Sequence, residues 1–427
     1  MTNPELISNP VRIIKMVYGG QALGELPDGK KVFVWNALPG ETVRARIIKQ
    51  RRTYAEAIAE EIVQASAERV VPKETNYLAT SPWQMMTFAA ENTYKRDIVA
   101  ELMQQQGVNV PEIGETVHDN QEYHYRNKME YSFWGDDDGL HLALHMRGSH
   151  GKQIVQGSVL AMSALDAAAE LVRKMLSDLQ CRAGDLKTII VRVSQKGEAV
   201  ASLFVKVETF PTLALPNGLK GLRVYYSNPK SPASVPTRLV QELGDCLLTD
   251  TLLGKSFTYD GDSFFQVNIP IFEKALQAIA DNVQEGELVD MYAGVGSIGL
   301  SVAKRKVDLV ELDAAAAAMA QVNAKAAAVP AEVIETPAEK SLEYITSDKP
   351  VIFDPPRAGL HDKVTDKVLE ARPPQVMYLS CNPATQARDL AKLQEAYDIT
   401  AMTVFNFFPR TPHIECLAVL KRKKLIQ

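Results

Sequence analysis

The sequence predicts a protein of three domains: a small β-barrel, a mixed α/β domain and an α/β domain with a doubly wound parallel sheet. Two observations support this fold class. Turn signals divide residues 1–64 into short runs of alternating polarity, which is typical of strands. From about residue 257 onward, strand-like apolar runs alternate with helical ones. At about 100–200 residues per domain, a chain of 427 residues has room for all three.

The composition is that of an ordinary globular protein, with 46% hydrophobic and 23% charged residues. No apolar run approaches the ~20 residues that span a bilayer, and the N-terminus lacks a secretory pattern. We therefore expect a soluble, cytoplasmic monomer without membrane contact. The four cysteines are scattered, so neither a disulfide framework nor a bound metal is expected.

The charge pattern limits any nucleic-acid surface to local patches. The net charge is −5 and the pI is about 5.9, whereas a dedicated nucleic-acid binder is usually basic. Residues 1–64 nevertheless carry nine Lys/Arg against seven Asp/Glu, which gives 9 − 7 = +2. The segment Lys421-Arg422-Lys423-Lys424 is wholly basic. Such runs are equally compatible with a solvated face.

Residues 1–64 form the first predicted domain. Five glycines separate its strand-like runs, and several short strands in about 60 residues favour a small closed barrel such as the OB-fold. Positive side chains on this barrel could contact phosphates, although each could equally be an ordinary surface residue. These candidates are Arg44, Arg46, Lys49, Arg51 and Arg52.

Residues 65–256 form the second predicted domain, of mixed α/β type. A helix is expected over 83–106 and could pack on the third domain. A strand over 123–134 carries Arg126 and Lys128, which we take as candidate RNA contacts. His145 and Arg147 are weaker candidates of the same kind, and ordinary surface is the alternative for all four.

Residues 257–427 form the third predicted domain, a Rossmann-like sheet whose ligands should bind beyond the carboxyl ends of the strands. The segment from Asp290 to Gly299 follows an apolar strand, and its glycines allow close approach to a ligand. The next strand ends near Glu311, about 20 residues further on, which suits a ribose hydroxyl pair. S-adenosylmethionine, a dinucleotide or a purely structural loop would all fit this pattern.

Three further strand ends carry chemical groups. Asp354 caps one strand and is followed by two prolines. Cys381 lies just before a helix start, where the helix dipole should favour a thiolate nucleophile. Glu415 begins the last strand and could act as a base, with His413 as the alternative. The other cysteines, Cys181, Cys246 and Cys416, are expected to be small buried hydrophobes.

The order of these motifs resembles the RNA 5-methyluridine methyltransferase family, and the first domain resembles the TRAM domain of RNA-binding proteins. The most specific motifs are DPPRAGL at 354–360 and SCNPATQARDL at 380–390. The others are FFQVN (264–268), DMYAGVGSIGL (290–300), VELDAAAAAMAQVNA (310–324) and FFPRTPHIECLAVL (407–420).

The resemblance implies S-adenosylmethionine as cofactor and a uridine of structured RNA as substrate. Cys381 would add to carbon 6 of the base, and Glu415 would later remove the proton from carbon 5. Phe264 would stack on the flipped base, and Asp354 would bond the uracil edge beside the cofactor. The remaining cofactor contacts implied are Gln266, Asp290, Tyr292, Gly294, Gly296 and Glu311.

Departures from the family pattern bear on the cofactors and the substrate. Many members hold a four-iron cluster through cysteines, but residues 71–86 contain none, so no iron–sulfur cluster is expected. A cytosine-5 methyltransferase is disfavoured because no proline precedes Cys381, and an amine methyltransferase because Arg357 stands where an aromatic is expected. A non-catalytic RNA-binding protein or chaperone is the alternative of another class. Among substrates, 23S rRNA is favoured over the tRNA T-loop.

Overall fold

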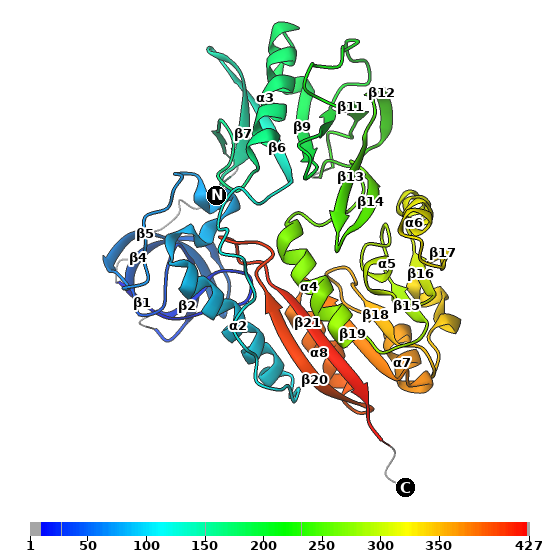
Figure 1. The fold of residues 1–427 in the computed structure, drawn as a ribbon. Coiled ribbons are helices and arrows are strands. Elements are labelled where there is room, and N and C mark those ends of the chain that lie inside the picture. The colour runs from blue at the N-terminus through cyan, green and yellow to red at the C-terminus, as the bar shows by residue number, and fades with distance from the viewer. Residues whose placement is uncertain (1–9, 27, 150, 232, 425–427) are drawn as a thin grey trace.

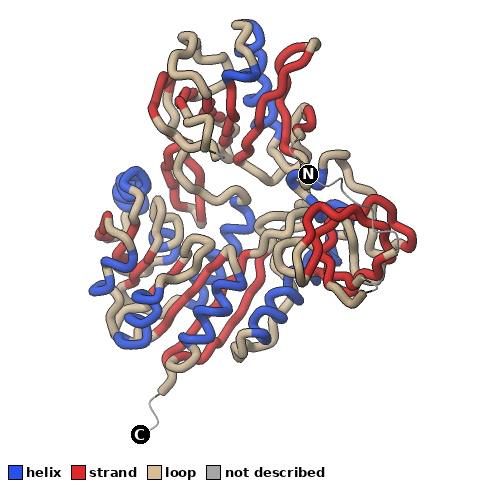
Figure 2. Tube along the Cα trace, turned by 180° about the vertical axis from the view of Figure 1, so that it is seen from behind, coloured by secondary structure: helices blue, strands red, loops and turns tan. Residues whose placement is uncertain are grey.

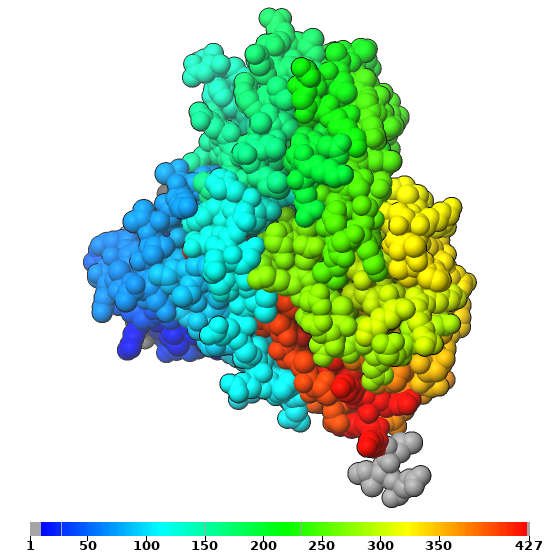
Figure 3. Space-filling model, viewed as in Figure 1, coloured from blue at the N-terminus to red at the C-terminus, as the bar shows by residue number. Residues whose placement is uncertain are grey.

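A computed structural model describes residues 10–424, except 27, 150 and 232, and arranges them in three lobes. In Figure 1 the N-terminal lobe lies at the left, the central lobe at the top and the C-terminal lobe at the lower right. The space-filling view shows the three lobes in contact, with the cyan segment wedged between the barrel and the C-terminal strands (Figure 3). Among the described helices, none is both long and apolar enough to cross a membrane.

The N-terminal lobe is a closed barrel with strand order β1-β2-β3-β5-β4, which confirms the predicted barrel. Among the described residues, its strands pair antiparallel except for β3 with β5. In β4 the predicted alternation holds at its start, where Val43 and Ala45 are buried and Arg44 and Arg46 are not. The strands are β1 (Val11–Met16), β2 (Ala22–Glu25), β3 (Lys31–Trp35), β4 (Thr42–Gln50) and β5 (Tyr54–Gln64).

The helix expected over 83–106 is two elements. A 3-10 turn, η1 (Pro82–Met85), follows the short helix α1 (Tyr77–Thr80), and the long helix α2 (Phe88–Gln105) begins only after extended Met86. Thr87 caps α2 by accepting the backbone N–H of Ala90. Helix α2 packs against α8 (Pro383–Leu393) and β20 (Tyr397–Phe405) of the C-terminal lobe.

The central lobe is built on a seven-stranded sheet with the order β12-β11-β10-β9-β6-β7-β8. Helix α3 (Ser163–Asp178) packs on β9, β7 and β10, with the 3-10 turn η2 (Ala183–Asp185) nearby. The strands are β6 (Lys128–Asp136), β7 (Gly139–His145), β8 (Lys152–Ile154), β9 (Leu186–Val193), β10 (Ala199–Val205), β11 (Gly221–Tyr226) and β12 (Arg238–Gly244). A separate hairpin, β13 (Leu247–Leu252) and β14 (Lys255–Asp260), leads from this lobe into the C-terminal one (Figure 1).

The C-terminal lobe contains a seven-stranded sheet of order β17-β16-β15-β18-β19-β21-β20, in which only β21 is antiparallel to its neighbours. This confirms the doubly wound domain; Figure 2 shows helices against the sheet. The remaining strands are β15 (Leu288–Met291), β16 (Val307–Glu311), β17 (Ala331–Glu335), β18 (Val351–Phe353), β19 (Gln375–Ser380) and β21 (Glu415–Arg422). The remaining helices are α4 (Ile269–Asn282), α5 (Gly299–Val302), α6 (Ala314–Ala327) and α7 (Asp362–Ala371), with the 3-10 turns η3 (Ala338–Lys340) and η4 (Leu342–Tyr344).

Alternation along the buried strands divides the core of this lobe between the two faces of the sheet. In β19, Val376 and Tyr378 belong to one core, and Met377 and Leu379 to the other. The first core is continuous with the interior of the barrel through a bridge that includes Trp83. The barrel and the C-terminal sheet therefore share one hydrophobic core, whereas the central lobe has its own.

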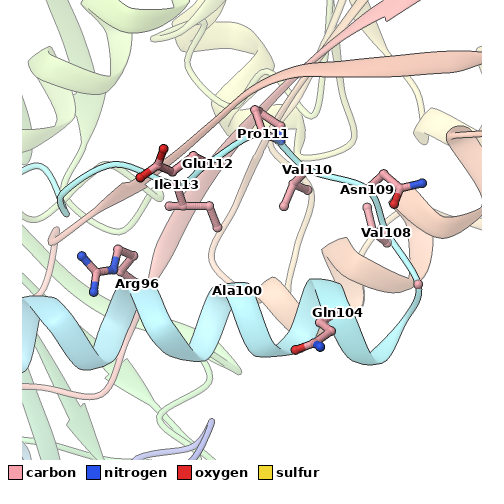
Figure 4. A pocket seen from close by; sticks show the side chains of 10 residues that line it. Arg96, Ala100, Gln104, Val108, Asn109, Val110, Pro111, Glu112 and Ile113 are labelled. Carbon is pink, nitrogen blue, oxygen red and sulfur yellow. The ribbon is translucent and has the colours of Figure 1, made fainter.

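The chain after α2 turns back and runs along the helix. A cavity of about 460 Å³ lies between α2 and residues 107–113, with Val110 and Ile113 directed toward the helix (Figure 4). Its described lining includes Arg96 and Glu112 but none of the predicted site residues. This cavity is therefore separate from the candidate active site.

Candidate active site

A cavity of about 1450 Å³ opens beyond the carboxyl ends of β15, β16, β18 and β19, and reaches the central lobe at β11. This is the edge of a doubly wound sheet at which ligands bind. Most of the predicted site residues meet here although they come from distant parts of the chain. Those in its wall are Arg126, Phe264, Gln266, Tyr292, Gly294, Glu311, Asp354, Cys381 and Glu415.

Strand pairing brings Cys381 and Glu415 together. The last aligned pair of β19 and β21 is Ser380 with Cys416, so the next position on each strand places Cys381 beside Glu415. Cys381 is half-buried and Glu415 is only 4% exposed. A thiol and a carboxyl group thus adjoin on the cavity wall.

The surroundings of Cys381 correct one expectation from the sequence. Burial raises the pKa of its thiol to about 11, and the nearby Glu415 and Asp354 add to this increase. Arg357 and a backbone hydrogen bond at Cys381 act in the opposite sense. The N-terminus of α8 is already capped, because the Asn382 side chain accepts the N–H groups of Ala384 and Thr385. The helix start therefore does not by itself give a thiolate in the protein without substrate.

The two carboxyl groups at the site are also shifted toward their protonated forms. Burial raises the pKa of Asp354 to about 7. Burial, reinforced by Asp354, raises the pKa of Glu415 well above its usual value, while Arg357 opposes the shift. The pKa of His413 is lowered to about 4 by its removal from bulk water and by nearby cations, so its imidazole is neutral at pH 7. Each group can therefore gain or lose a proton as a ligand changes its surroundings.

The glycine loop is held from below by Asp290. This carboxylate is fully buried and accepts the backbone N–H of Gly299 at 2.7 Å, and an added Cβ at Gly299 would lie 2.8 Å from it. Of the cofactor contacts expected from the sequence, Asp290 and Gly296 do not belong to the described cavity wall. Asp290 holds the loop through this bond, and the predicted cofactor contacts of Asp290 and Gly296 stay predictions.

The wall above this loop remains open to a ligand. Tyr292 and Gly294 have left-handed backbone conformations, with φ of 70° and 56°, and both line the cavity. A Cβ added at Gly294 would meet no atom within 4 Å. Glu311 accepts the backbone N–H groups of Gly294 and Asp313, each at 2.7 Å. Since each carboxylate oxygen has a second lone pair, Glu311 can still accept hydroxyl groups.

Phe264 and Phe265 point in opposite directions. Phe264 is 71% exposed and lines the cavity, whereas Phe265 is buried and stacks on Tyr259 with ring centres 4.0 Å apart. Asn127 of the central lobe donates to the Gln266 carbonyl at 3.0 Å and so fixes this segment. The exposed ring is therefore a flat apolar surface held at the cavity by its buried neighbours.

The basic residues predicted to bind RNA are divided by the structure. Arg126 lines the cavity, but Lys128 is absent from the described wall, and burial together with Arg192 lowers the pKa of Lys128 to about 8. Three of the five barrel candidates form ion pairs across the β4–β5 hairpin. Among the described residues, the other two, Arg51 and Arg52, form no ion pair. The pairs are Arg44 with Glu61, Arg46 with Glu60 and Lys49 with Glu56.

The loop that carries Phe408 rests on a buried charge network from α2. Lys95 is fully buried, lies 3.0 Å from Glu91, and donates to the Asn406 side chain at 2.6 Å and to the Phe408 carbonyl at 3.0 Å. The Arg410 backbone N–H donates to Glu91 at 2.9 Å. Breaking any of these bonds would leave a buried charge without a partner, which is costly. The network therefore holds this loop in position beside the cavity.

The part of the wall contributed by the central lobe was not predicted from the sequence. Arg223 on β11 donates to Asp260 at 2.5 Å and to Asp262 at 2.9 Å, and Tyr225 donates to Asp262 at 2.8 Å. All four residues line the cavity. Only the Asp260-Gly-Asp262 turn, just before the FFQVN motif, is recognisable in the sequence as a neighbour of the site.

Two family models match this chain. Residues 247–423 match the model described as tRNA (Uracil-5-)-methyltransferase, and residues 10–59 match the TRAM domain. An uncharacterized RNA methyltransferase of Lactobacillus johnsonii is 30% identical over 443 residues, covering 96% of this chain and 98% of that protein. One of Listeria innocua is 29% identical over 437 residues, with 96% of each covered.

A solved structure shares the fold over nearly the whole chain. The tRNA (uracil-54, C5)-methyltransferase of Pyrococcus abyssi, in complex with S-adenosyl-L-homocysteine, superposes with a TM-score of 0.77 at 21% identity. The match covers 96% of this chain and 100% of that one.

Proposed function

This chain belongs to the RNA (uracil-5-)-methyltransferase family with an N-terminal TRAM domain, and from that premise we propose that it methylates carbon 5 of a uridine in folded RNA through a covalent adduct on Cys381. The observation that carries the proposal is the pairing of Cys381 with Glu415 in one cavity with the glycine loop. A nucleophile, a base and a nucleotide-binding loop at one strand edge are what this reaction requires.

The wall around β15 and β16 suits S-adenosylmethionine. The open space beside Gly294 admits a ligand close to the backbone, and Glu311 has lone pairs left for ribose hydroxyls. Gln266 and Tyr292 complete this part of the proposed cofactor site, and Asp354 lies next to it. When bound, S-adenosylmethionine supplies the methyl group as an electrophile on a sulfonium sulfur.

Cys381 supplies the activation that uracil needs. Its thiolate adds to carbon 6, and the electron pair of the C5–C6 bond moves toward the C4 oxygen, so carbon 5 becomes nucleophilic. Arg357 is the cation that favours the thiolate. Asp354, with a pKa of about 7, can bond the uracil edge in either protonation state. After methylation, Glu415 removes the C5 proton, the C6–S bond breaks and the double bond is restored.

Two RNAs are candidate substrates for this reaction. We place 23S rRNA first and the tRNA T-loop second. The second candidate is favoured by the P. abyssi protein, which shares the fold over almost the whole chain and is a tRNA methyltransferase.

The test is methyl transfer to defined RNAs. The purified protein is incubated with labelled S-adenosylmethionine and, separately, bulk tRNA and 23S rRNA that lack 5-methyluridine. Nucleosides are then separated by chromatography. We expect label in 5-methyluridine from one RNA only, which also identifies the substrate. Label in a methylated cytidine or in an exocyclic amine would refute the proposed reaction.

The two phenylalanines provide a matched pair for testing base stacking. Loss of one stacked base contact costs about 1–3 kcal/mol, so Phe264→Ala should lower kcat/KM by about 5- to 150-fold. Its melting temperature should stay unchanged because the ring is 71% exposed. Phe265→Ala should instead destabilise the protein by about 3–5 kcal/mol. Equal losses of stability in the two variants would contradict the stacking role, and Phe264→Trp should retain activity.

A further inference from the structure

A loop of the barrel reaches the chemical centre. It connects β1 to β2, and its Gly20 lies against Pro412, where an added Cβ would come within 2.5 Å of the proline side chain. The Trp83 indole donates to the Gly20 carbonyl at 3.0 Å, and the Trp83 backbone N–H donates to the Arg410 carbonyl at 3.1 Å. This loop is therefore fixed against the chain that leads into Glu415.

The same loop bonds to the residue that follows Cys381. The Tyr18 hydroxyl donates to the Asn382 side-chain oxygen at 2.8 Å. The orientation of this amide is determined by its other contacts, since its nitrogen donates to the Arg357 carbonyl at 2.8 Å. The oxygen also accepts the first N–H groups of α8 at 3.1 and 3.4 Å, so the bond from Tyr18 is the shortest of the three.

Asn382 therefore joins three elements around the thiol: the barrel, the start of α8 and the loop that carries Arg357. On the other side of Cys381, the Ser380 hydroxyl accepts the Asn382 backbone N–H at 3.1 Å. The Tyr18 ring is close enough to the centre that Cys381 and Arg357 both affect the pKa of its hydroxyl, which partial burial raises. None of the described cavity-wall residues comes from the barrel, and Tyr18, which is 39% exposed, lies outside that wall.

We propose that Tyr18 is a positioning residue of the active site, through which the barrel holds Cys381 in place by way of Asn382. This inference rests on the proposed role of Cys381 as the nucleophile. It assigns to the TRAM barrel a part in the chemistry as well as in binding RNA. The competing interpretation is that the barrel only tethers RNA, in which case the Tyr18 hydroxyl should not affect the chemical step.

Tyr18→Phe removes only the hydroxyl and tests this inference. We expect the single-turnover rate constant at saturating RNA to fall about three- to tenfold, the effect of one neutral hydrogen bond, with the RNA dissociation constant unchanged. A second measurement needs no RNA: alkylation of Cys381 by iodoacetamide, followed by mass spectrometry. Alkylation should become faster in the variant, because a less constrained thiol is more accessible, while methyl transfer becomes slower.

The control is Tyr54→Phe, a barrel tyrosine that packs on Phe33 with ring centres 5.6 Å apart and is not part of the active site. It should change neither measurement. If Tyr18→Phe weakens RNA binding but leaves the saturated rate and the alkylation unchanged, Tyr18 is an RNA contact and the inference is wrong. If the wild-type protein shows no cysteine-dependent methylation, the proposed function fails whatever Tyr18 does.

A double-mutant cycle with Asn382→Ser guards against an effect of lost stability. Serine still caps α8, but its shorter side chain does not reach Tyr18. If Tyr18 acts through Asn382, adding Tyr18→Phe to Asn382→Ser should change the rate by less than twofold, because the shared bond is already lost. Fully additive losses in the cycle would overturn the proposed route from the barrel to Cys381.

Discussion

Replacement of Cys381 by alanine should lower the rate of methyl transfer by about 10⁴- to 10⁶-fold, the range found when a covalent nucleophile is removed. Without the thiolate, carbon 5 of uracil stays a poor nucleophile, and nothing else in the described cavity wall replaces this sulfur. The other three cysteines lie outside that wall. The effect is measured as single-turnover methylation of the RNA, tRNA or 23S rRNA, that accepts label in the test described under the proposed function.

Cys181→Ala is the matched control, because Cys181 is also half-buried but packs in the central lobe. It should leave the rate within about twofold of wild type, as is usual for a substitution away from the site. A Cys381→Ala protein that retained normal activity would exclude covalent catalysis.

In the wild-type protein, kcat/KM should rise with pH above neutrality. The reason is that the thiol of the free enzyme has a pKa of about 11, and Glu415 is also shifted toward its protonated form.

The sequence was a good guide to the fold wherever burial imposes a regular pattern. The strands ending at Asp354 and Cys381 are buried on both faces, so they are continuous apolar runs in the sequence. Strand β17 (Ala331–Glu335) has no such run, because it is an edge strand in which no residue is fully buried.

Helix α2 was misjudged for a different physical reason. In its first turns, the inner face buries the charged residues Glu91 and Lys95 and the polar Asn92, and the apolar residues Ile98, Val99 and Met103 follow only later. The apolar period therefore predicts the helix but does not mark its first turn. The start of the helix depends on Thr87, whose capping role appears only once the extended conformation of Met86 is known.

Some features of the active site could likewise be predicted from the sequence, and others depend on the fold. Motifs at strand ends could be located from the sequence, because parallel strands bring their carboxyl ends to one edge. The protonation state of Cys381 could not be predicted, since it depends first on burial of the thiol and then on the carboxyl groups of Glu415 and Asp354 from two other strands. Tyr18 lies 364 positions from Asn382, so only the folded barrel reveals their contact.

Replacement of Glu415 by glutamine should separate the two halves of the reaction. Glutamine keeps the size of the side chain at this buried position but cannot remove a proton. Cys381 should still add to the uracil ring, and each enzyme molecule should still transfer one methyl group. The C5 proton then remains, and the C6–S bond cannot break. We expect multiple turnover to fall by about 10²- to 10⁴-fold, the usual contribution of a general base.

The distinguishing result is a covalent RNA–protein species that accumulates in Glu415→Gln and survives denaturing electrophoresis. The double variant with Cys381→Ala should give no such species, which identifies the attached residue. His413 is the rival base, because its pKa of about 4 leaves the imidazole neutral at pH 7 and it lines the same cavity. If Glu415→Gln turns over normally and His413→Gln accumulates the adduct, the base is His413. Because Glu415 adjoins Cys381 across paired strands, whereas His413 lies two residues before β21 begins, we expect the adduct in Glu415→Gln.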